Sequence, residues 1–345
     1  MPSNIAHPLI RGAVRLGTAL ALVALALAAL SQGARLVFRS DPQDGLRQAD
    51  ALFAAGRYHD ARTAYGLLVA RAPALGVART RLGIVYAVRD ERAAANETLA
   101  AAIGLRLAPR EHDLVRLYQG RVAAAGGQRA EAMRFWTEVG ARSPLYPIRH
   151  VLEAENILAV GDYAGAEAAY RAALLPGLPR AWRALAHTRL AMLRASSDPQ
   201  AALAALDGLT QLDRLASPAE TVWTAPLLPD AQPDARQVGE ALRAPASQRA
   251  QLLGQLYLGA GLYALAEAQF AAVAPDSPSA LSAAAYAAYT RWSAGDRDEG
   301  LSRLKALVAA YPDEPRARAL LALAYLAASD APSARACSSS GDQSP

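Results

Sequence analysis

The sequence predicts an all-α fold in which helical hairpins stack one on the next. Two observations lead to this. The first is a phrase of about 34 residues that returns along most of the chain. The second is the lack of strand signals: we find no run of alternating β-branched residues bounded by hairpin turns, and only 6% of the residues are aromatic. A repeat of this period without strands indicates a solenoid of helix–turn–helix units.

The clearest copy of the phrase lies in residues 247–278. Its landmarks, at fixed spacing, are Leu253, Gly254, Tyr257, Gly261, Tyr263, Ala266, Phe270 and Pro278. With this copy as a guide, repeats begin near Pro42, Gly76, Asp113, Pro147, Pro179, Ser247, Leu281 and Pro315. The step from Pro179 to Ser247 is twice as long as the usual period. We therefore expect a degenerate or replaced unit between residues 215 and 246.

Each landmark has a physical role in a helical hairpin. Glycines such as Gly56 and Gly261 fit the turn between the two helices, because glycine takes a positive φ without a steric penalty. A small residue followed one turn later by a large one, as in Ala166 and Tyr170, places both on the face that meets the first helix. We expect prolines to close the second helices, at Pro73, Pro109, Pro144, Pro278 and Pro312.

The landmarks resemble those of the tetratricopeptide repeat (TPR) family over roughly residues 42–332. The resemblance implies an all-α, right-handed superhelical solenoid of TPR-like helical hairpins. The pattern departs from the family at Arg129, where tyrosine is usual, and at Gly300, where alanine is usual. The alternative is a non-repeating helical bundle of the same composition.

The apolar N-terminus predicts that the chain is targeted to a membrane. Residues 16–30 contain no charge, and Arg11 and Arg15 stand just before them. One interpretation is an uncleaved signal anchor that crosses the membrane through residues 13–34. The other is a cleaved signal peptide, which would leave a secreted or periplasmic protein. In both cases we expect the repeats to lie outside the cytoplasm.

Residues 215–246 are rich in proline and contain Trp223. They form either a functional loop insertion or a lapsed repeat in which Trp223 fills a gap. Residues 238–243 could form a short helix, and Asp41 before Pro42 predicts the start of the first repeat. The predicted segments are a signal anchor or signal peptide (1–39), about five repeats (40–214), the irregular segment (215–246), further repeats with a terminal capping helix (247–332) and a disordered tail (333–345).

Composition limits the classes of function. The net charge is +5 and the sequence pI about 9.5, but the arginines are spread among acidic residues along the helices, so we expect no nucleic-acid partner. The Ala-, Arg- and Pro-rich composition is typical of a high-GC bacterial genome. The histidines are scattered and no phosphate loop or nucleophile elbow is present. Glu153 and Glu155 are interpreted as solvated helix residues. We expect no enzymatic activity, metal, cofactor or small-molecule substrate.

The TPR resemblance implies that the first helices of the repeats line a groove that binds a protein or peptide. The groove positions carried over from the family are Arg121, Glu155, Arg180, Arg183, His187, Gln251, Gln255 and Tyr289. Leu46, Phe53 and Trp292 occupy similar positions and are better explained by packing between helices. The predicted function is a protein-interaction scaffold held at the membrane. The alternative is an accessory subunit that binds its complex mainly through the N-terminal helix.

Overall fold

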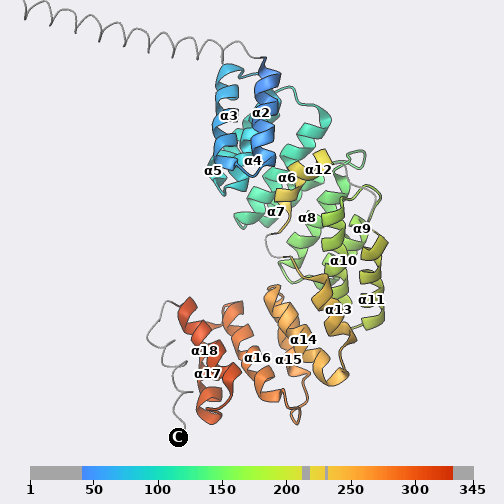
Figure 1. Cartoon of the computed structure of the whole chain (residues 1–345), viewed down its shortest axis with the longest axis vertical. Coiled ribbons are helices and arrows are strands. Elements are labelled where there is room, and N and C mark those ends of the chain that lie inside the picture. The colour runs from blue at the N-terminus through green and yellow to red at the C-terminus, as the bar shows by residue number, and fades with distance from the viewer. Residues whose placement is uncertain (1–40, 212–217, 230–231, 329–345) are drawn as a thin grey trace, which may run out of the picture. The chain divides into compact units, whose positions relative to one another are not determined.

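The computed structural model describes residues 41–211, 218–229 and 232–328, and in these residues it is built from helices and turns without strands (Figure 1). The chain forms two compact units, residues 1–107 and residues 108–345. The predicted anchor and the predicted tail lie outside the described residues. Within them, no helix is both long enough and apolar enough to cross a membrane.

The N-terminal unit contains two helical hairpins: α2 (Pro42–Ala54) with α3 (Tyr58–Arg71), and α4 (Gly76–Val88) with α5 (Arg92–Ile103). The start of α2 is as predicted, because the Asp41 carboxylate accepts a hydrogen bond from the Gln43 N–H and Pro42 is the first helical residue. Gly56 takes the expected positive φ of 72° in the first turn. In the second turn Asp90, which is not a glycine, does so at 59°.

The C-terminal unit continues the series and confirms the prediction of TPR-like hairpins. It contains five described hairpins followed by a single last helix. These are α6 (Pro109–Ala125) with α7 (Arg129–Thr137), α8 (Tyr146–Leu158) with α9 (Tyr163–Ala173), α10 (Arg180–Arg194) with α11 (Pro199–Asp207), α14 (Ala246–Gly259) with α15 (Tyr263–Ala271), α16 (Ala280–Ala294) with α17 (Arg297–Ala310), and α18 (Pro315–Ala327).

Three of the five expected helix ends are wrong. Pro144 and Pro278 lie in the connections to the next helix, seven residues after α7 ends at Thr137 and α15 ends at Ala271. Pro109 does not close the second helix of its hairpin, because α5 already ends at Ile103. Pro109 instead is the first residue of α6, where the missing N–H costs nothing because no carbonyl precedes it in the helix. The third repeat therefore starts earlier than Asp113.

In three hairpins a glycine on the first helix lies against a large residue of the second, and in α16/α17 the glycine, Gly300, is on the second helix against Trp292 of the first. The glycines Gly83, Gly120 and Gly254 have Leu99, Trp136 and Phe270 directly against their Cα atoms, at the same sequence spacing in each case. Trp136 is 2% exposed, and its indole Nε1–H donates to the Leu117 carbonyl at 3.1 Å. The same close approach explains why repeats of different composition keep one geometry.

The segment between α11 and α14 replaces a standard hairpin. It contains two 3₁₀ turns, η1 (Gly208–Gln211) and η2 (Ala225–Leu227), and the helices α12 (Pro218–Thr224) and α13 (Ala235–Arg243). The short helix expected over residues 238–243 is confirmed as part of α13. Val238 and Leu242 of α13 are buried, and the helix contacts α10, α11 and α14, so it continues the stack.

A candidate binding face on the C-terminal unit

Three charged residues occupy the same position on successive first helices of the C-terminal unit: Arg121 on α6, Glu155 on α8 and Arg189 on α10. Each follows the one before it by one repeat period. Two of them are among the predicted groove residues. Arg189 is not, although counting one period from Glu155 would have found it. We call the surface around these three residues the binding face.

Glu155 and Arg189 form a largely buried ion pair. The Arg189 Nε and Nη2 atoms donate to the two Glu155 oxygens at 2.9 and 3.1 Å, and the side chains are 7% exposed for Arg189 and 19% for Glu155. Tyr170 on α9 also donates its hydroxyl to Glu155. Burial alone would lower the pKa of Arg189, but Glu155 and Tyr170 together outweigh it, so the pKa is raised. Burial and then Glu155 raise the pKa of Tyr170 well above its usual value.

The tyrosine-to-carboxylate contact recurs in the N-terminal unit, where Tyr65 on α3 donates to Asp50 on α2. In both hairpins the carboxylate lies 15 residues before the tyrosine. The acidic group thus satisfies a phenol that is otherwise buried. The interpretation of Glu155 as a solvated helix residue is therefore wrong.

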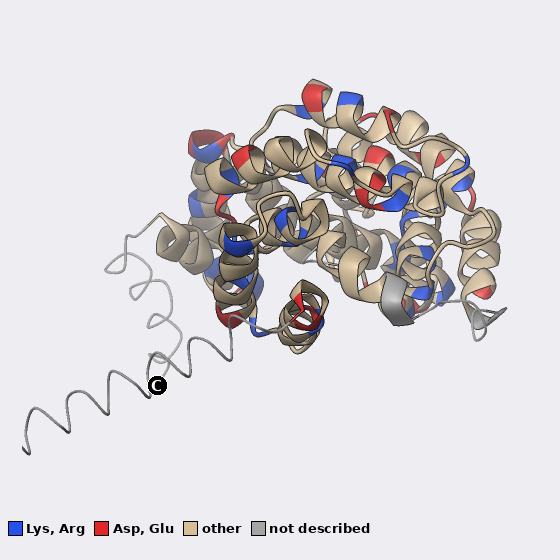
Figure 2. Cartoon of the chain, turned by 90° about the horizontal axis from the view of Figure 1, so that it is seen from above, with Lys and Arg blue, Asp and Glu red and all other residues tan. Residues whose placement is uncertain are grey.

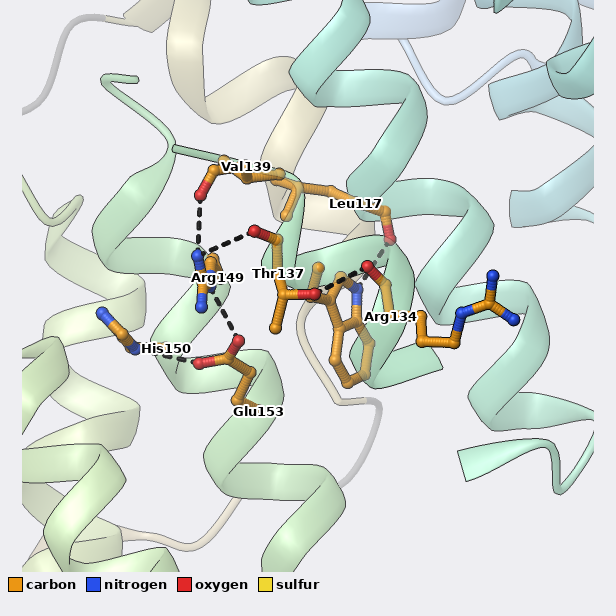
Figure 3. Close-up of polar contacts among 8 residues, drawn as sticks. Leu117, Arg134, Thr137, Val139, Arg149, His150 and Glu153 are labelled. Atoms are coloured by element: carbon orange, nitrogen blue, oxygen red, sulfur yellow. Dashed lines mark hydrogen bonds and ion pairs between the residues drawn. The ribbon is translucent and has the colours of Figure 1, made fainter. Parts of the chain in front are cut away.

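Glu153, on the same helix, is also not solvated (Figure 3). It accepts from the Arg149 Nε at 2.7 Å and lies 2.9 Å from the His150 Nδ1. Arg149 in turn donates to the carbonyls of Thr137 and Val139 at 3.2 and 2.9 Å. This network ties the end of α7 to α8.

Two hollows open on the binding face and share Glu155. The first, about 310 Å³, is lined by residues that include Arg121, Arg129, Trp136 and Asn156. The second, about 370 Å³, is lined by residues that include Arg189, Tyr163 and Tyr263. In the first hollow the Asn156 Nδ2 donates to the Arg129 carbonyl at 3.3 Å, while the buried Oδ1 has no hydrogen-bond partner among the described residues. A buried acceptor of this kind is suited to an incoming N–H group.

Arg121 binds a segment of the chain itself. Its Nη1 donates to the Leu227 carbonyl at 2.8 Å, with the Pro226 and Leu228 carbonyls at 3.4 Å. One turn earlier on α6, Tyr118 donates its hydroxyl to the Trp223 carbonyl at 2.8 Å. Leu227 is buried, whereas Trp223 is only partly buried. If a residue of this segment fills a gap, it is therefore Leu227 rather than Trp223.

The other predicted groove residues form two further groups. On α10, Arg183 donates to the Leu175 carbonyl at 3.0 Å, Arg180 is exposed, and the half-buried His187 lies against Gly208. Burial lowers the pKa of His187, and the nearby Arg183 adds to the effect. Their role as partner contacts stays a prediction.

The second group lies on α14 and α16. The Gln251 Nε2 donates to the Ser282 Oγ at 3.2 Å, and Tyr289 stacks on Trp292 with ring centroids 5.4 Å apart. Gln255 is half-buried. Leu46 and Phe53 in the N-terminal unit are buried, as the packing explanation requires.

Charged residues of both signs are spread over the part of the chain that the structure describes. In Figure 2 the basic and acidic residues of the described helices are interspersed and do not gather into one stripe. Within the described ranges, no group of three or more His, Cys, Asp or Glu side chains is placed to hold a metal ion.

Comparisons with known proteins give structural similarity only. No protein-family model matches the sequence. A search of curated proteins finds no match either. Among solved structures, the C-terminal part of a TPR repeat-containing protein from Cytophaga hutchinsonii is 15% identical, with 80% of this chain and 98% of that chain covered and a TM-score of 0.43. The Cut9–Hcn1 hetero-tetramer of APC/C is 15% identical, with 85% of this chain and 51% of that chain covered and a TM-score of 0.37. A human IFIT1 dimer with PPP-AAAA is 14% identical, with 86% of this chain and 71% of that chain covered and a TM-score of 0.39.

Proposed function

We propose that this TPR-like protein is a non-enzymatic scaffold that binds a protein segment on the binding face of its C-terminal unit. The observation that carries the proposal is that this face already binds polypeptide: Arg121 holds backbone carbonyls of residues 226–228 at the edge of a hollow. Carbonyl groups occur in every peptide, so the same donor can serve a partner.

The hollows offer the rest of what an extended peptide needs. The Asn156 Oδ1 can accept a backbone N–H, and the aromatic rings of Trp136, Tyr163 and Tyr263 line the hollows. The Glu155–Arg189 pair neutralises the charge between the two hollows. A partner of low charge, with backbone groups and apolar side chains to bury, fits this surface.

Site-specific cross-linking tests the scaffold. A photoreactive residue at Tyr263 should capture a defined partner in the native membrane, and the same residue at Leu67, which is 65% exposed on α3, should not. Asn156→Ala should weaken the capture while leaving the helical signal in circular dichroism unchanged. Equal capture from Tyr263 and Leu67, or capture insensitive to Asn156→Ala, would contradict the proposal.

The membrane address is proposed on the sequence of residues 16–30 and the arginines before them. We place the repeats outside the cytoplasm, held by an uncleaved anchor. Membrane fractionation with protease protection tests the location. A mature chain that starts near Gln32 would show cleavage instead. Exchange of residues 1–39 for an unrelated anchor separates the scaffold, which keeps its partner, from a subunit that binds through its N-terminal helix.

We propose a protein rather than a nucleic-acid partner, because two arginines of the binding face are already engaged. Arg121 is held by carbonyls and Arg189 by Glu155. Nucleic-acid binding would appear as affinity for single-stranded RNA or DNA that falls steeply with salt.

A further inference from the structure

The segment of residues 221–229 lies far from α6 in sequence but contacts it in the fold. The hydrogen bonds from Tyr118 and Arg121 join residues about one hundred positions apart, and α12 is drawn beside α6 in Figure 1. Leu227 and Pro229 line the first hollow together with residues of α6, α7 and α8. The segment is thus a peptide bound in cis at the place proposed for the partner.

The conformation of the segment suits a bound peptide. After the 3₁₀ turn of Ala225–Leu227, Leu228 takes φ −59° and ψ 146°, which is the polyproline II region, and Pro229 follows. Leu227 is 1% exposed and supplies the apolar anchor. The pattern is therefore a buried leucine between two prolines, Pro226 and Pro229, with carbonyls directed at Arg121.

The hydrogen bonds from α6 to this segment end on backbone carbonyls. These donors meet carbonyls at the C-terminal end of α12, in the 3₁₀ turn that follows it and at Leu228, so they recognise the backbone of a short helical turn that runs into an extended residue. The leucine and the prolines add selectivity for the side chains. A segment of another protein with the same features can take the same donors. Because the cis segment is tethered, its effective concentration at the face is high, and a partner must compete with it.

We infer that residues 221–229 are an intramolecular competitor, and that the partner is an apolar, proline-containing peptide that displaces them from α6 and the first hollow. The inference rests on the proposed function and specifies its ligand. The association constant measured for a partner is then the intrinsic association constant multiplied by the fraction of molecules in which the cis segment is released.

The test uses a fluorescent peptide with the sequence of residues 221–229, T-V-W-T-A-P-L-L-P, and the full chain in detergent. Leu227→Ser should release the cis segment and raise the affinity for the peptide at least about tenfold over the unmodified protein. Leu67→Ser, the same change at a leucine exposed on α3, should leave the affinity unchanged. A peptide with serine in place of the leucine that corresponds to Leu227 should bind neither protein.

Equal affinity of the peptide for the unmodified protein and for Leu227→Ser overturns the inference. So does a serine-substituted peptide that binds Leu227→Ser as tightly as the unsubstituted peptide does. Should Leu227→Ser lose its helical signal, hydrogen exchange of the unmodified protein decides. Residues 221–229 should then exchange faster than α6 and α8, since the segment opens by itself. Exchange of the segment only together with α6 and α8 overturns the inference.

The same variants separate this inference from the proposed function. Cross-linking of a partner from Tyr263 with equal yield in the unmodified protein and in Leu227→Ser supports the scaffold and contradicts the competitor. Tight binding of the peptide by Leu227→Ser, without any partner captured in membranes, supports the competitor and contradicts the scaffold.

Discussion

Gly120→Ala is the substitution with the sharpest consequence, because a single methyl group enters the contact that closes the third hairpin. A Cβ atom at this position would lie 2.5 Å from Cδ1 of Trp136 and 2.6 Å from Cε2. Ordinary contacts between such atoms are about 3.5–4.0 Å. The indole cannot easily retreat, since Trp136 is buried and its Nε1–H is bonded to the Leu117 carbonyl.

Two opposing effects set the magnitude. Overpacking of a buried contact costs about 1–3 kcal/mol, whereas replacing a helical glycine by alanine gains about 0.5–1 kcal/mol. The overlap exceeds what a small rotation of the ring can relieve, so we expect a net loss of about 1–2 kcal/mol in the free energy of unfolding of the C-terminal unit.

Gly259→Ala is the matched control, because a Cβ there meets nothing within 4 Å and the residue is the last of α14. It should be neutral or stabilising by about 0.5 kcal/mol. The double variant Gly120→Ala/Trp136→Tyr should recover part of the loss, since the next repeat has an alanine, Ala154, and a tyrosine, Tyr170, at the corresponding two positions. Urea unfolding followed by far-UV circular dichroism measures all four proteins. Equal stability of Gly120→Ala and Gly259→Ala would refute the reasoning.

Three further predictions concern Glu155, His187 and Gly261. Glu155→Gln leaves the buried Arg189 without a counter-ion and should cost about 3–5 kcal/mol in urea unfolding, while Glu155→Leu/Arg189→Met should cost less than either single change. Burial lowers the pKa of His187 in the folded state, so the unfolded state binds the proton more readily. The contribution of His187 to the free energy of unfolding is therefore greatest above about pH 6.5 and is lost as the pH falls below that value. His187→Asn should flatten this decline between pH values of about 8 and 5. Gly261→Ala should cost about 1–2 kcal/mol by thermal unfolding although its surroundings are open, because φ is 72°.

The hairpins could be predicted from the sequence because their signals are local. Glycine at the turn, a small residue opposite a large one and proline near the helix ends all act within one repeat. The positive φ values at Gly56 and Gly261 follow directly from this pattern. The predictions for Pro109, Pro144 and Pro278 are wrong because a proline between two helices can end the first, begin the second or lie in the connection. The three helices before these prolines end six or seven residues earlier.

The candidate site could be predicted only in part, because its contacts join residues far apart in sequence. A groove position does not reveal whether its side chain faces a partner or another part of the chain. Arg121 contacts carbonyls more than one hundred residues away, and Glu155 contacts a residue one repeat later. The placement of residues 221–229 depends on tertiary packing for which the sequence carries no periodic signal.

Arg121, Glu155 and Arg189 alternate in the sign of their charge, so the three repeats that carry them are not equivalent. Removing residues 146–179, one whole period, would keep every hairpin landmark in register but would place one arginine beside another with no carboxylate between them. A buried guanidinium beside a second cation is strongly unfavourable. The order of these repeats is therefore fixed by charge as well as by shape, and they cannot be shuffled as interchangeable modules.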